Sequence, residues 1–268
     1  MIKTLTIAGF DGSGGAGIQA DLKTFSALGC YGMSVLTALP VQNTQGVISC
    51  YDIGLKAIEE QLKAIFDDII PDAIKIGMLF NSDIIELVAN FLEKNARDIP
   101  IIVDPVMVAK SGDRLLFENA VSSLKKYILP IARVVTPNIP EACDLVGINN
   151  INTEEEMFEV ASTILDMGSF SVMLKGGHLD SDNSMDLFLS RDKKEFMYAK
   201  RIDTKNTHGT GCTLSAAICS YIAHGKDEIE ACRLAKDYLF NAIVAGKEDS
   251  VGKGAGPVHH FYSIWNNS

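Results

Sequence analysis

The sequence lacks several features that would mark other classes of protein. Its six cysteines include no C-x-x-C pair and no histidine at a matching spacing, so neither a zinc site nor a disulfide framework is expected. The chain has 24 Lys and Arg against 34 Asp and Glu, a net charge of −10, with no block of like charges. No general attraction to nucleic acid or to an anionic membrane is therefore expected, and the predicted partners are small molecules.

Long apolar runs are also missing, since none approaches the ~18 residues that a membrane-spanning helix needs. The N-terminal segment, MIKTLTIAGFDGSGG, has one lysine, a short apolar run and then a polar, glycine-rich stretch. This is typical of an opening strand and not of a signal peptide. Together with the unpaired cysteines, it predicts a cytoplasmic protein.

Apolar runs of strand length alternate with helix-length periodic segments along most of the 268 residues. This alternation predicts an α/β fold with a mostly parallel sheet and helices on both faces. A single domain over 1–268 is expected, because no linker, repeat or low-complexity tract divides the chain. Strands are predicted at 2–8, 34–41, 73–76, 99–103, 133–135 and 171–174, with a hairpin of 185–190 and 194–202. Helices are predicted at 16–28, 55–69, 82–95, 120–127, 140–146, 153–167, 213–224 and 227–246.

Polar or glycine residues follow almost every predicted strand. In an open parallel sheet, ligands bind beyond the carboxyl ends of the strands. The residues at these ends include Gly9, Gln42, Asp104, Asn138 and Lys175. Ordinary turn chemistry explains part of this set, but it explains poorly a lysine that directly follows an apolar run.

Residues 12–17, GSGGAG, match the G-x-G-x-x-G fingerprint of dinucleotide-binding proteins. That fingerprint also requires an acidic residue at the end of the second strand, to bind the ribose hydroxyl. The predicted second strand ends in Val41, followed by Gln42 and Asn43, without an acid. A nicotinamide or flavin enzyme is therefore disfavoured, and the glycines indicate a close backbone approach or a tight entry into the following helix.

The stretch NTHGTGC, residues 206–212, lies at the start of a predicted helix. The first turn of a helix leaves backbone N–H groups without partners and carries partial positive charge, so it attracts anions such as phosphate. Gly209 and Gly211 would let the backbone come close to such a group. We expect the pKa of Cys212 to be lowered at this place, which would make its thiol a base or a nucleophile. The alternative is a glycine-rich turn before a packed helix with a buried cysteine.

A phosphoryl-transfer site needs backbone donors, a metal, a cation near the phosphates and a base for the accepting hydroxyl. The chain has a candidate for each on a different strand end. It contains no G-x-x-x-x-G-K-[ST] motif and no protein-kinase motif set, so both of those classes are disfavoured.

Eight blocks of the sequence resemble, in order, the hydroxymethylpyrimidine and phosphomethylpyrimidine kinases of thiamine biosynthesis, members of the ribokinase-like superfamily. The blocks are TIAGFDGSGGAGIQADLKTFSALG (6–29), VQNTQGV (41–47), KIGML (75–79), DPVMVAKSGD (104–113), TPNIPEA (136–142), LKGGH (174–178), KNTHGTGC (205–212) and GPVHHF (256–261). The resemblance covers essentially the whole chain. It implies a three-layer ribokinase-like fold and ATP- and Mg²⁺-dependent phosphorylation of 4-amino-5-hydroxymethyl-2-methylpyrimidine and of its monophosphate, and it suggests a homodimer.

The resemblance also implies roles for the glycine turn. Gly209, Thr210 and Gly211 would cradle the transferring phosphoryl group together with Cys212. Cys212 stands where most ribokinase relatives carry an aspartate base. It would lie against the hydroxymethyl group of the substrate and take its proton.

The substrate side is assigned by the same resemblance. The amide of Gln42 offers one donor and one acceptor, which complement an aminopyrimidine. Asp21 and the backbone at Gly9 would lie near it, and Met78 and Val106 would form apolar walls, although core packing is the alternative for these two.

On the phosphate side, Asn138 and Glu141 would position Mg²⁺, largely through waters. Asp104 would face the phosphates or the metal. Lys175 would neutralise the phosphates of ATP, with a surface salt bridge as the alternative. The KSGD loop, 110–113, would be a lid that excludes water.

The chain departs from the family pattern at Phe10, where a small residue is usual, and at Pro40-Val41 before the QNT sequence. Both departures border the expected substrate pocket, so a pyridoxal or pyridoxine kinase is the alternative reading. A pyrimidine-binding sensor without catalysis is a third reading.

Overall fold

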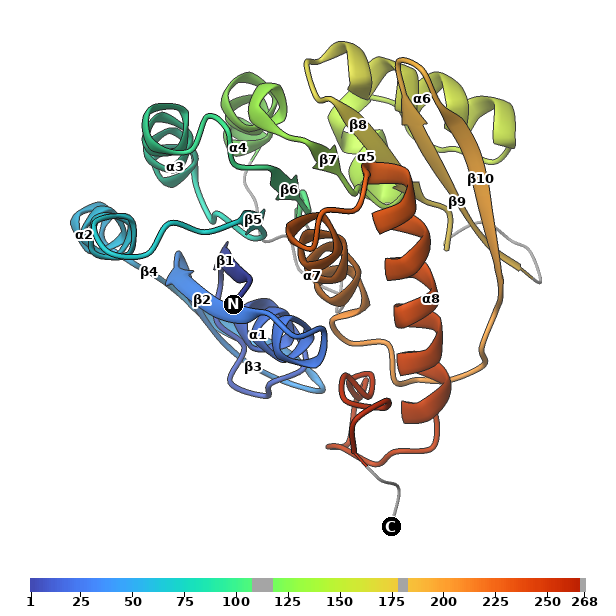
Figure 1. Cartoon of the computed structure of the whole chain (residues 1–268). Helices are drawn as coiled ribbons and strands as arrows, with labels where there is room; N and C mark the ends of the chain where they lie inside the picture. Colours follow the sequence, from blue (N-terminus) through green and yellow to red (C-terminus); the bar gives the residue numbers. More distant parts are fainter. Residues whose placement is uncertain (108–117, 178–182, 266–268) are drawn as a thin grey trace.

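The computed structural model describes residues 1–107, 118–177 and 183–265. The main strands are β1 (Lys3–Ala8), β2 (Tyr31–Leu36), β5 (Ala73–Ile76), β6 (Ile101–Val103), β7 (Val134–Val135), β8 (Ser171–Lys175), β9 (Asn183–Ser190) and β10 (Lys194–Lys200). They form one sheet in the order β10-β9-β8-β7-β6-β5-β1-β2 (Figure 1). In this sheet the neighbouring strands β2, β1, β5, β6, β7 and β8 are parallel, and the β8–β9 and β9–β10 pairs are antiparallel. The predicted parallel sheet and its closing hairpin are confirmed.

Helices cover both faces of this sheet. They are α1 (Gly17–Ala27), α2 (Leu55–Phe66), α3 (Ser82–Asn95), α4 (Glu118–Ser123), α5 (Ile139–Val146), α6 (Glu154–Asp166), α7 (Thr210–Ala223) and α8 (Glu228–Gly246). Successive side chains of a strand point to opposite faces. Ile101 and Val103 accordingly belong to the core formed with α2 to α6, and Ile102 to the core formed with α7 and α8. The fold is therefore a three-layer α/β arrangement, as predicted.

The predicted second strand at 34–41 is wrong as a single element. The chain leaves the main sheet after Leu36, and β3 (Ala38–Asn43) pairs instead with β4 (Gly46–Asp52), which no pattern predicted. Buried Thr37 marks the break, because its hydroxyl donates to the carbonyl of Met78 at 2.6 Å. Pro40 lies within β3 and has no N–H to donate, which a two-stranded sheet tolerates. Gln42 therefore reaches its place from a separate small sheet.

Two other expectations change in detail. Helix α7 begins at Thr210 and not at residue 213, so Cys212 lies inside its first turn. The helix predicted at 120–127 is α4 followed by a π-helical turn at Leu124–Ile128. The predicted lid at 110–113 lies outside the described residues.

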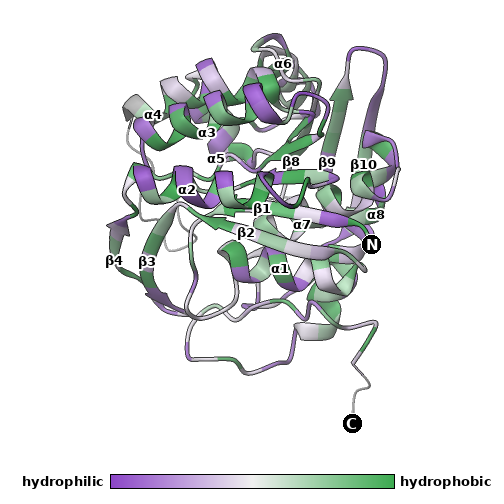
Figure 2. Cartoon of the chain, turned by 60° about the vertical axis from the view of Figure 1, so that its left-hand side comes forward, coloured by the Kyte–Doolittle hydropathy of each residue, from purple (hydrophilic) through white to green (hydrophobic). Residues whose placement is uncertain are grey.

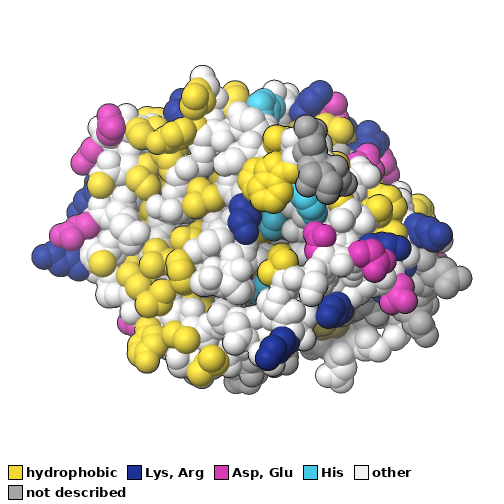
Figure 3. Space-filling view, turned by 90° about the horizontal axis from the view of Figure 1, so that it is seen from below, with side chains coloured by type: hydrophobic (Ala, Val, Ile, Leu, Met, Phe, Trp, Pro, Cys, Tyr) yellow, Lys and Arg dark blue, Asp and Glu magenta, His cyan; other side chains and the backbone are white. Residues whose placement is uncertain are grey.

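Hydropathy follows these layers. Figure 2 shows hydrophobic residues along the central strands, while α2 and α3 alternate between hydrophobic and hydrophilic residues. None of the helices in the described ranges is both long enough and apolar enough to cross a membrane. Figure 3 looks at the lower end of Figure 1, where hydrophobic side chains gather over the left half of the face. On β3 and β4, Leu39, Val41, Ile48 and Tyr51 are exposed.

Candidate active site

A cavity of about 430 Å³ lies beyond the carboxyl ends of β1, β5 and β6, against the start of α7. Its lining includes Gly9, Phe10, Pro40, Gln42, Met78, Asp104, Val106, Asn138, Glu141, Lys175, Gly209, Thr210, Gly211 and Cys212. Every candidate site residue from the sequence therefore lines this cavity, with the exception of Asp21. The carboxyl ends of parallel strands meet at one edge of the sheet, which is why residues so far apart in sequence converge here.

A second cavity of about 400 Å³ shares part of the wall of the first. Both are lined by Asn138, Lys175, Thr207, Thr210 and Gly211. The second cavity continues along α8 and β10, where its lining includes the apolar residues Leu239, Phe240, Ile243 and Ile202. The two cavities thus meet at the glycine turn before α7. The sequence did not reveal the α8 residues, because their spacing is that of any helix packed on a core.

The glycine turn fits an anion-binding role. Gly209, the N-cap of α7, has φ 77° and ψ 11°, a left-handed conformation that glycine adopts without strain. A Cβ atom there would collide with the carbonyl oxygen of Gly15. No side chain caps the helix, and although the Thr210 N–H donates to the Thr207 carbonyl at 3.5 Å, the N–H groups of Gly211 and Cys212 in the first turn can meet a ligand.

The expected lowering of the Cys212 pKa is wrong. Burial raises the pKa of this thiol to about 11, and the Lys75 ammonium opposes that rise only in part. A desolvated thiolate is unfavourable, and here this effect outweighs the attraction of the helix N-terminus. Cys212 therefore stays protonated at neutral pH in the ligand-free protein.

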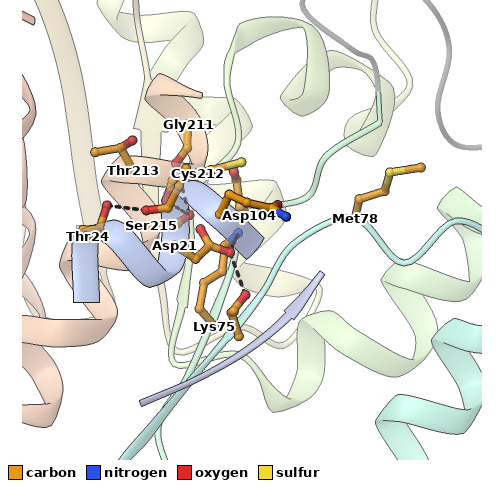
Figure 4. Close-up of polar contacts among 12 residues, drawn as sticks. Asp21, Thr24, Lys75, Met78, Asp104, Gly211, Cys212, Thr213 and Ser215 are labelled. Atoms are coloured by element: carbon orange, nitrogen blue, oxygen red, sulfur yellow. Dashed lines mark hydrogen bonds and ion pairs between the residues drawn. The ribbon is translucent and has the colours of Figure 1, made fainter. Parts of the chain in front are cut away.

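Asp21 does not reach the cavity, contrary to expectation. Its side chain is fully buried, and Oδ2 accepts hydrogen bonds from Lys75 Nζ at 2.8 Å and from Thr6 Oγ1 at 2.6 Å (Figure 4). Lys75 itself was missed, although a lysine between Ile74 and Ile76 of a central strand is a clear sign of a paired buried charge. Burial lowers the pKa of Lys75, but the Asp21 carboxylate outweighs it and the net shift is upward.

A second cation faces the cavity from the end of β8. Lys175 Nζ lies 2.9 Å from Asp104 Oδ1 and 3.9 Å from Glu141 Oε2. Burial lowers the pKa of Lys175, and the carboxylates of Asp104 and Glu141 outweigh it, so the ammonium stays charged. The surface salt bridge considered from the sequence is wrong, because Asp104 and Glu141 are both buried.

Asn138 and Glu141 shape the start of α5. The Asn138 side chain accepts from the Glu141 N–H at 2.9 Å, and Glu141 Oε2 accepts from the Asn138 N–H at 2.8 Å, which is a capping box. Burial, with the neighbouring Asp104 carboxylate, raises the pKa of Glu141 to about 7 against the opposing pull of Lys175. The sequence assigned both residues to Mg²⁺ through the family resemblance, and it predicted neither this cap nor this burial.

A histidine was also missed on the substrate side. His208 lines the first cavity, and its Nε2 lies 2.8 Å from Asp11 Oδ2. Asp11 also accepts from the N–H groups of Gly15 and Ala16 at 3.0 and 2.7 Å. Burial would raise the pKa of Asp11, but the hydrogen bonds from His208 and its other donors hold it well below the usual range. The glycine loop 12–17 is therefore folded around Asp11, and a Cβ on Gly15 would strike the His208 ring.

The carboxylates suit a hydrated magnesium ion better than an all-protein metal cage. No group of three or more His, Cys, Asp or Glu in the described ranges is arranged to hold a metal. Asp104 and Glu141 both line the first cavity, next to Lys175, which lines both cavities. Mg²⁺ is commonly held by one or two carboxylates, waters and substrate phosphates, so this donor set fits it.

Comparison with known proteins agrees with this site. Residues 11–259 match the family model described as phosphomethylpyrimidine kinase. The hydroxymethylpyrimidine/phosphomethylpyrimidine kinase of Escherichia coli strain K12 is 48% identical over 264 residues, which are 98% of this chain and 99% of that protein. The phosphomethylpyrimidine kinase structure from Clostridium difficile 630 has a TM-score of 0.81 at 46% identity and covers 91% of this chain and 100% of its own.

A pyridoxal kinase is also similar. The structure of the Staphylococcus aureus enzyme in complex with AMP-PCP and pyridoxal has a TM-score of 0.90 at 37% identity, covering 98% of this chain and 95% of its own. The family match spans most of the sequence, and the identity to the Escherichia coli protein extends over nearly all of both chains. This chain belongs to the phosphomethylpyrimidine kinase family.

Proposed function

We propose that the chain is an ATP-dependent kinase that phosphorylates 4-amino-5-hydroxymethyl-2-methylpyrimidine and its monophosphate, in thiamine biosynthesis. The observation that carries the proposal is the meeting of two cavities at the uncapped, glycine-lined start of α7. A phosphoryl donor on one side and an acceptor on the other would both face the same backbone N–H groups. This arrangement would hold the two substrates in line for transfer.

The acceptor would occupy the 430 Å³ cavity. The Gln42 amide would bind the ring nitrogen and the exocyclic amine, with Met78 and Val106 against the two faces of the ring. The carbonyl of Gly9 is already committed, since it accepts from the Ile18 N–H at 3.0 Å. Gly9 would therefore contribute a close backbone contact, with its carbonyl oxygen accepting from Ile18 and not from the substrate.

The nucleotide would occupy the 400 Å³ cavity. The apolar side chains of Leu239, Phe240 and Ile243 would contact the base, while Lys175 and the α7 N-terminus would bind the phosphates. AMP-PCP in the similar Staphylococcus aureus pyridoxal kinase supports nucleotide binding on this scaffold. Lys175 is held by Asp104, which keeps it pointed at the wall common to both cavities.

The acceptor hydroxyl would lie against Cys212. The γ-phosphoryl group would bond to the acceptor oxygen as its bond to the leaving ADP breaks, and the proton of the hydroxyl would pass to the sulfur of the Cys212 thiolate. Because the resting thiol has a pKa of about 11, only the ionised fraction can accept this proton. A loose phosphoryl-transfer transition state demands little activation of the hydroxyl, so a small thiolate fraction is sufficient.

Glu141, with Asp104 and Asn138 nearby, would hold Mg²⁺ through waters. The ion would neutralise charge on the ATP phosphates. Lys175 Nζ lies 2.9 Å from Asp104 and 3.9 Å from Glu141, so its charge offsets part of the repulsion between the two carboxylates.

We infer further that 1–268 works as one domain, that the enzyme is a homodimer and that it acts in the cytoplasm. Two cores that share a single sheet support the first point. Exposed apolar side chains on β3 and β4, with Leu39 opposite Tyr51, support a surface for a second copy. Light scattering on the purified chain measures the oligomeric state directly.

A pyridoxal kinase remains the second candidate, because Phe10 and Pro40 line the acceptor cavity and alter its wall. One coupled ADP-release assay with the pyrimidine, its monophosphate, pyridoxal and pyridoxine separates the candidates. Highest kcat/KM with the two pyrimidines supports the proposal. Preference for pyridoxal would replace it with the second candidate. If none of the four compounds led to ADP release, the result would point to a sensor.

A further inference from the structure

Lys75 places a positive charge in the centre of the sheet, and the free-energy cost of burying this charge requires an explanation. It lies between Ile74 and Ile76 on β5, and its side chain has no exposed surface. Desolvating an ion pair costs several kcal/mol per ion, and apolar replacements of such pairs are often neutral or stabilising. The Lys75–Asp21 pair is therefore poorly explained by stability alone.

The surroundings of this pair point toward the reaction centre. Lys75 lines the acceptor cavity. Its strand, β5, packs against α7, whose first turn lines the same cavity. A Cβ on Gly77 would lie only 2.7 Å from Lys75 Nζ, so a glycine two residues further on leaves room for the ammonium. Lys75 and Cys212 thus line one cavity from two elements that pack together, β5 and α7, and Figure 4 shows the two side chains.

The hydrogen bonds of Lys75 are incomplete. An ammonium has three donors, and within the described ranges its hydrogen-bond partner is Asp21 Oδ2 alone, at 2.8 Å. Asp21 is itself held by Thr6, which fixes the direction from which the carboxylate pulls. The pair is anchored on the side away from the cavity, and the remaining donors of Lys75 have no protein partner there.

We propose that Lys75 is a positioning residue for phosphoryl transfer: held by Asp21 and Thr6, its ammonium favours the thiolate form of Cys212, which takes the proton of the acceptor hydroxyl. Lys75 keeps its own proton throughout. Its charge also lies on the same side as the helix N-terminus, so both act on the developing negative charge. The role in transfer rests on the proposed function, whereas the influence on Cys212 does not.

The two charges of the pair act on Cys212 in opposite directions. Burial raises the pKa of the thiol; among the neighbouring charges, the ammonium of Lys75 lowers it, and the carboxylates of Asp21 and Asp104 raise it. A variant that removes one charge should therefore have the opposite effect to a variant that removes the other. A purely structural pair would not behave in this way, because loss of either partner would disturb the site in the same direction.

The test measures alkylation of Cys212 by iodoacetamide as a function of pH, followed by mass spectrometry of its peptide, without substrates. We expect Lys75→Met to slow alkylation at pH 8.5, by ~10-fold if the pKa of the thiol rises by one unit. Asp21→Asn should accelerate it. If both variants changed the alkylation rate in the same direction, or if neither changed it, the proposal would be overturned.

Two further variants distinguish the effect of the charges on Cys212 from a loss of folding. The double variant Lys75→Met/Asp21→Asn leaves no buried charge unpaired, and it should alkylate more slowly than Asp21→Asn alone. Lys236→Met is a matched control, because Lys236 also forms a buried pair, with Asp186 at 2.6 Å, and lines the second cavity and not the one that Cys212 lines. Its alkylation profile should equal that of the wild type, and a shift as large as that of Lys75→Met would also overturn the proposal.

Kinetics separate this proposal from the function on which it rests. If both hold, Lys75→Met lowers kcat about as much as it slows alkylation and leaves the KM for the pyrimidine nearly unchanged. A shift in alkylation with an unchanged kcat would overturn the role in transfer. A wild-type enzyme without kinase activity on any of the four compounds would overturn the proposed function and leave the alkylation result intact.

Discussion

Lys175 Nζ lies 2.9 Å from Asp104 Oδ1, and both side chains stand directly over Gly211. A Cβ atom on Gly211 would be 3.3 Å from Asp104 Oδ2 and 3.4 Å from Lys175 Nζ. The missing side chain therefore leaves the space in which a phosphoryl group could meet the N–H groups of the α7 N-terminus. The Lys175–Asp104 ion pair and Gly211 therefore form one anion-binding site.

Replacing Gly211 with alanine should separate stability from activity. Gly211 lies in the first turn of α7, so alanine should change the free energy of unfolding by no more than ~1 kcal/mol. The added methyl group displaces the phosphates by tenths of an ångström or more, and kcat should fall ~10²-fold. Urea unfolding and ADP release measure the two effects. Gly54→Ala, where a Cβ has open space, is the control, and equal activity in the two variants would contradict the model of the anion site.

The role of Cys212 as the base predicts how kcat depends on pH. If its thiolate is the base, kcat rises with pH as the thiol ionises, by ~10-fold per unit well below the pKa of about 11. Cys212→Ala should lower kcat far more than it raises the KM for the pyrimidine. Steady-state kinetics between pH 7 and 9.5 test this, and a kcat in Cys212→Ala equal to that of the wild type would refute the role.

Cys212→Asp provides a complementary test. A carboxylate is ionised over this whole range, so the rise of kcat with pH should disappear in this variant. The comparison uses the same assay and the same substrates. Persistence of the rise would show that another group titrates.

Glu141 predicts a dependence of stability on pH. Its pKa is raised by burial from 4.5 to about 7, so the folded state holds this proton more tightly than the unfolded state does. The contribution to stability is complete below pH 4.5 and is lost as the pH rises through 7, to a limit of ~3 kcal/mol. Glu141→Gln should remove most of this loss in urea unfolding at pH 5 and pH 8.

The matched control for this change is Glu156→Gln. Glu156 holds the same capping-box position in α6, but it is only partly buried. It should leave the pH dependence of unfolding as in the wild type. If the two variants behave alike, the cap and not the buried charge explains the effect.

Phe10 makes a prediction about substrate choice. It lines the acceptor cavity, so Phe10→Ala should enlarge the space available to a bulkier ring such as pyridoxal. We expect the ratio of kcat/KM for pyridoxal to that for the pyrimidine to increase ~10-fold, in the range typical of pocket-size changes. Val41→Ala is the control, because Val41 is 40% exposed and lies on the outer side of β3. An unchanged ratio in Phe10→Ala would exclude this residue as a determinant of specificity.

The sequence by itself determined the layered fold and most of the site. Strand-length apolar runs alternating with helical periods define a parallel sheet, and such a sheet brings its carboxyl strand ends to one edge whatever the loops do. That geometry is why Asp104, Asn138 and Lys175 could be placed together from their positions after strands, whereas Gln42 reaches the cavity from the separate sheet of β3 and β4.

Only the tertiary structure decided where burial falls. Local patterns show that Cys212 lies at a helix start, but the sign of its pKa shift depends on the layers packed around it. In the same way, Asp21 and Lys75 are 54 residues apart and pair only because β5 lies beside β1 and under α1. Desolvation and long-range pairing are properties of the packed chain, and no local spacing encodes them.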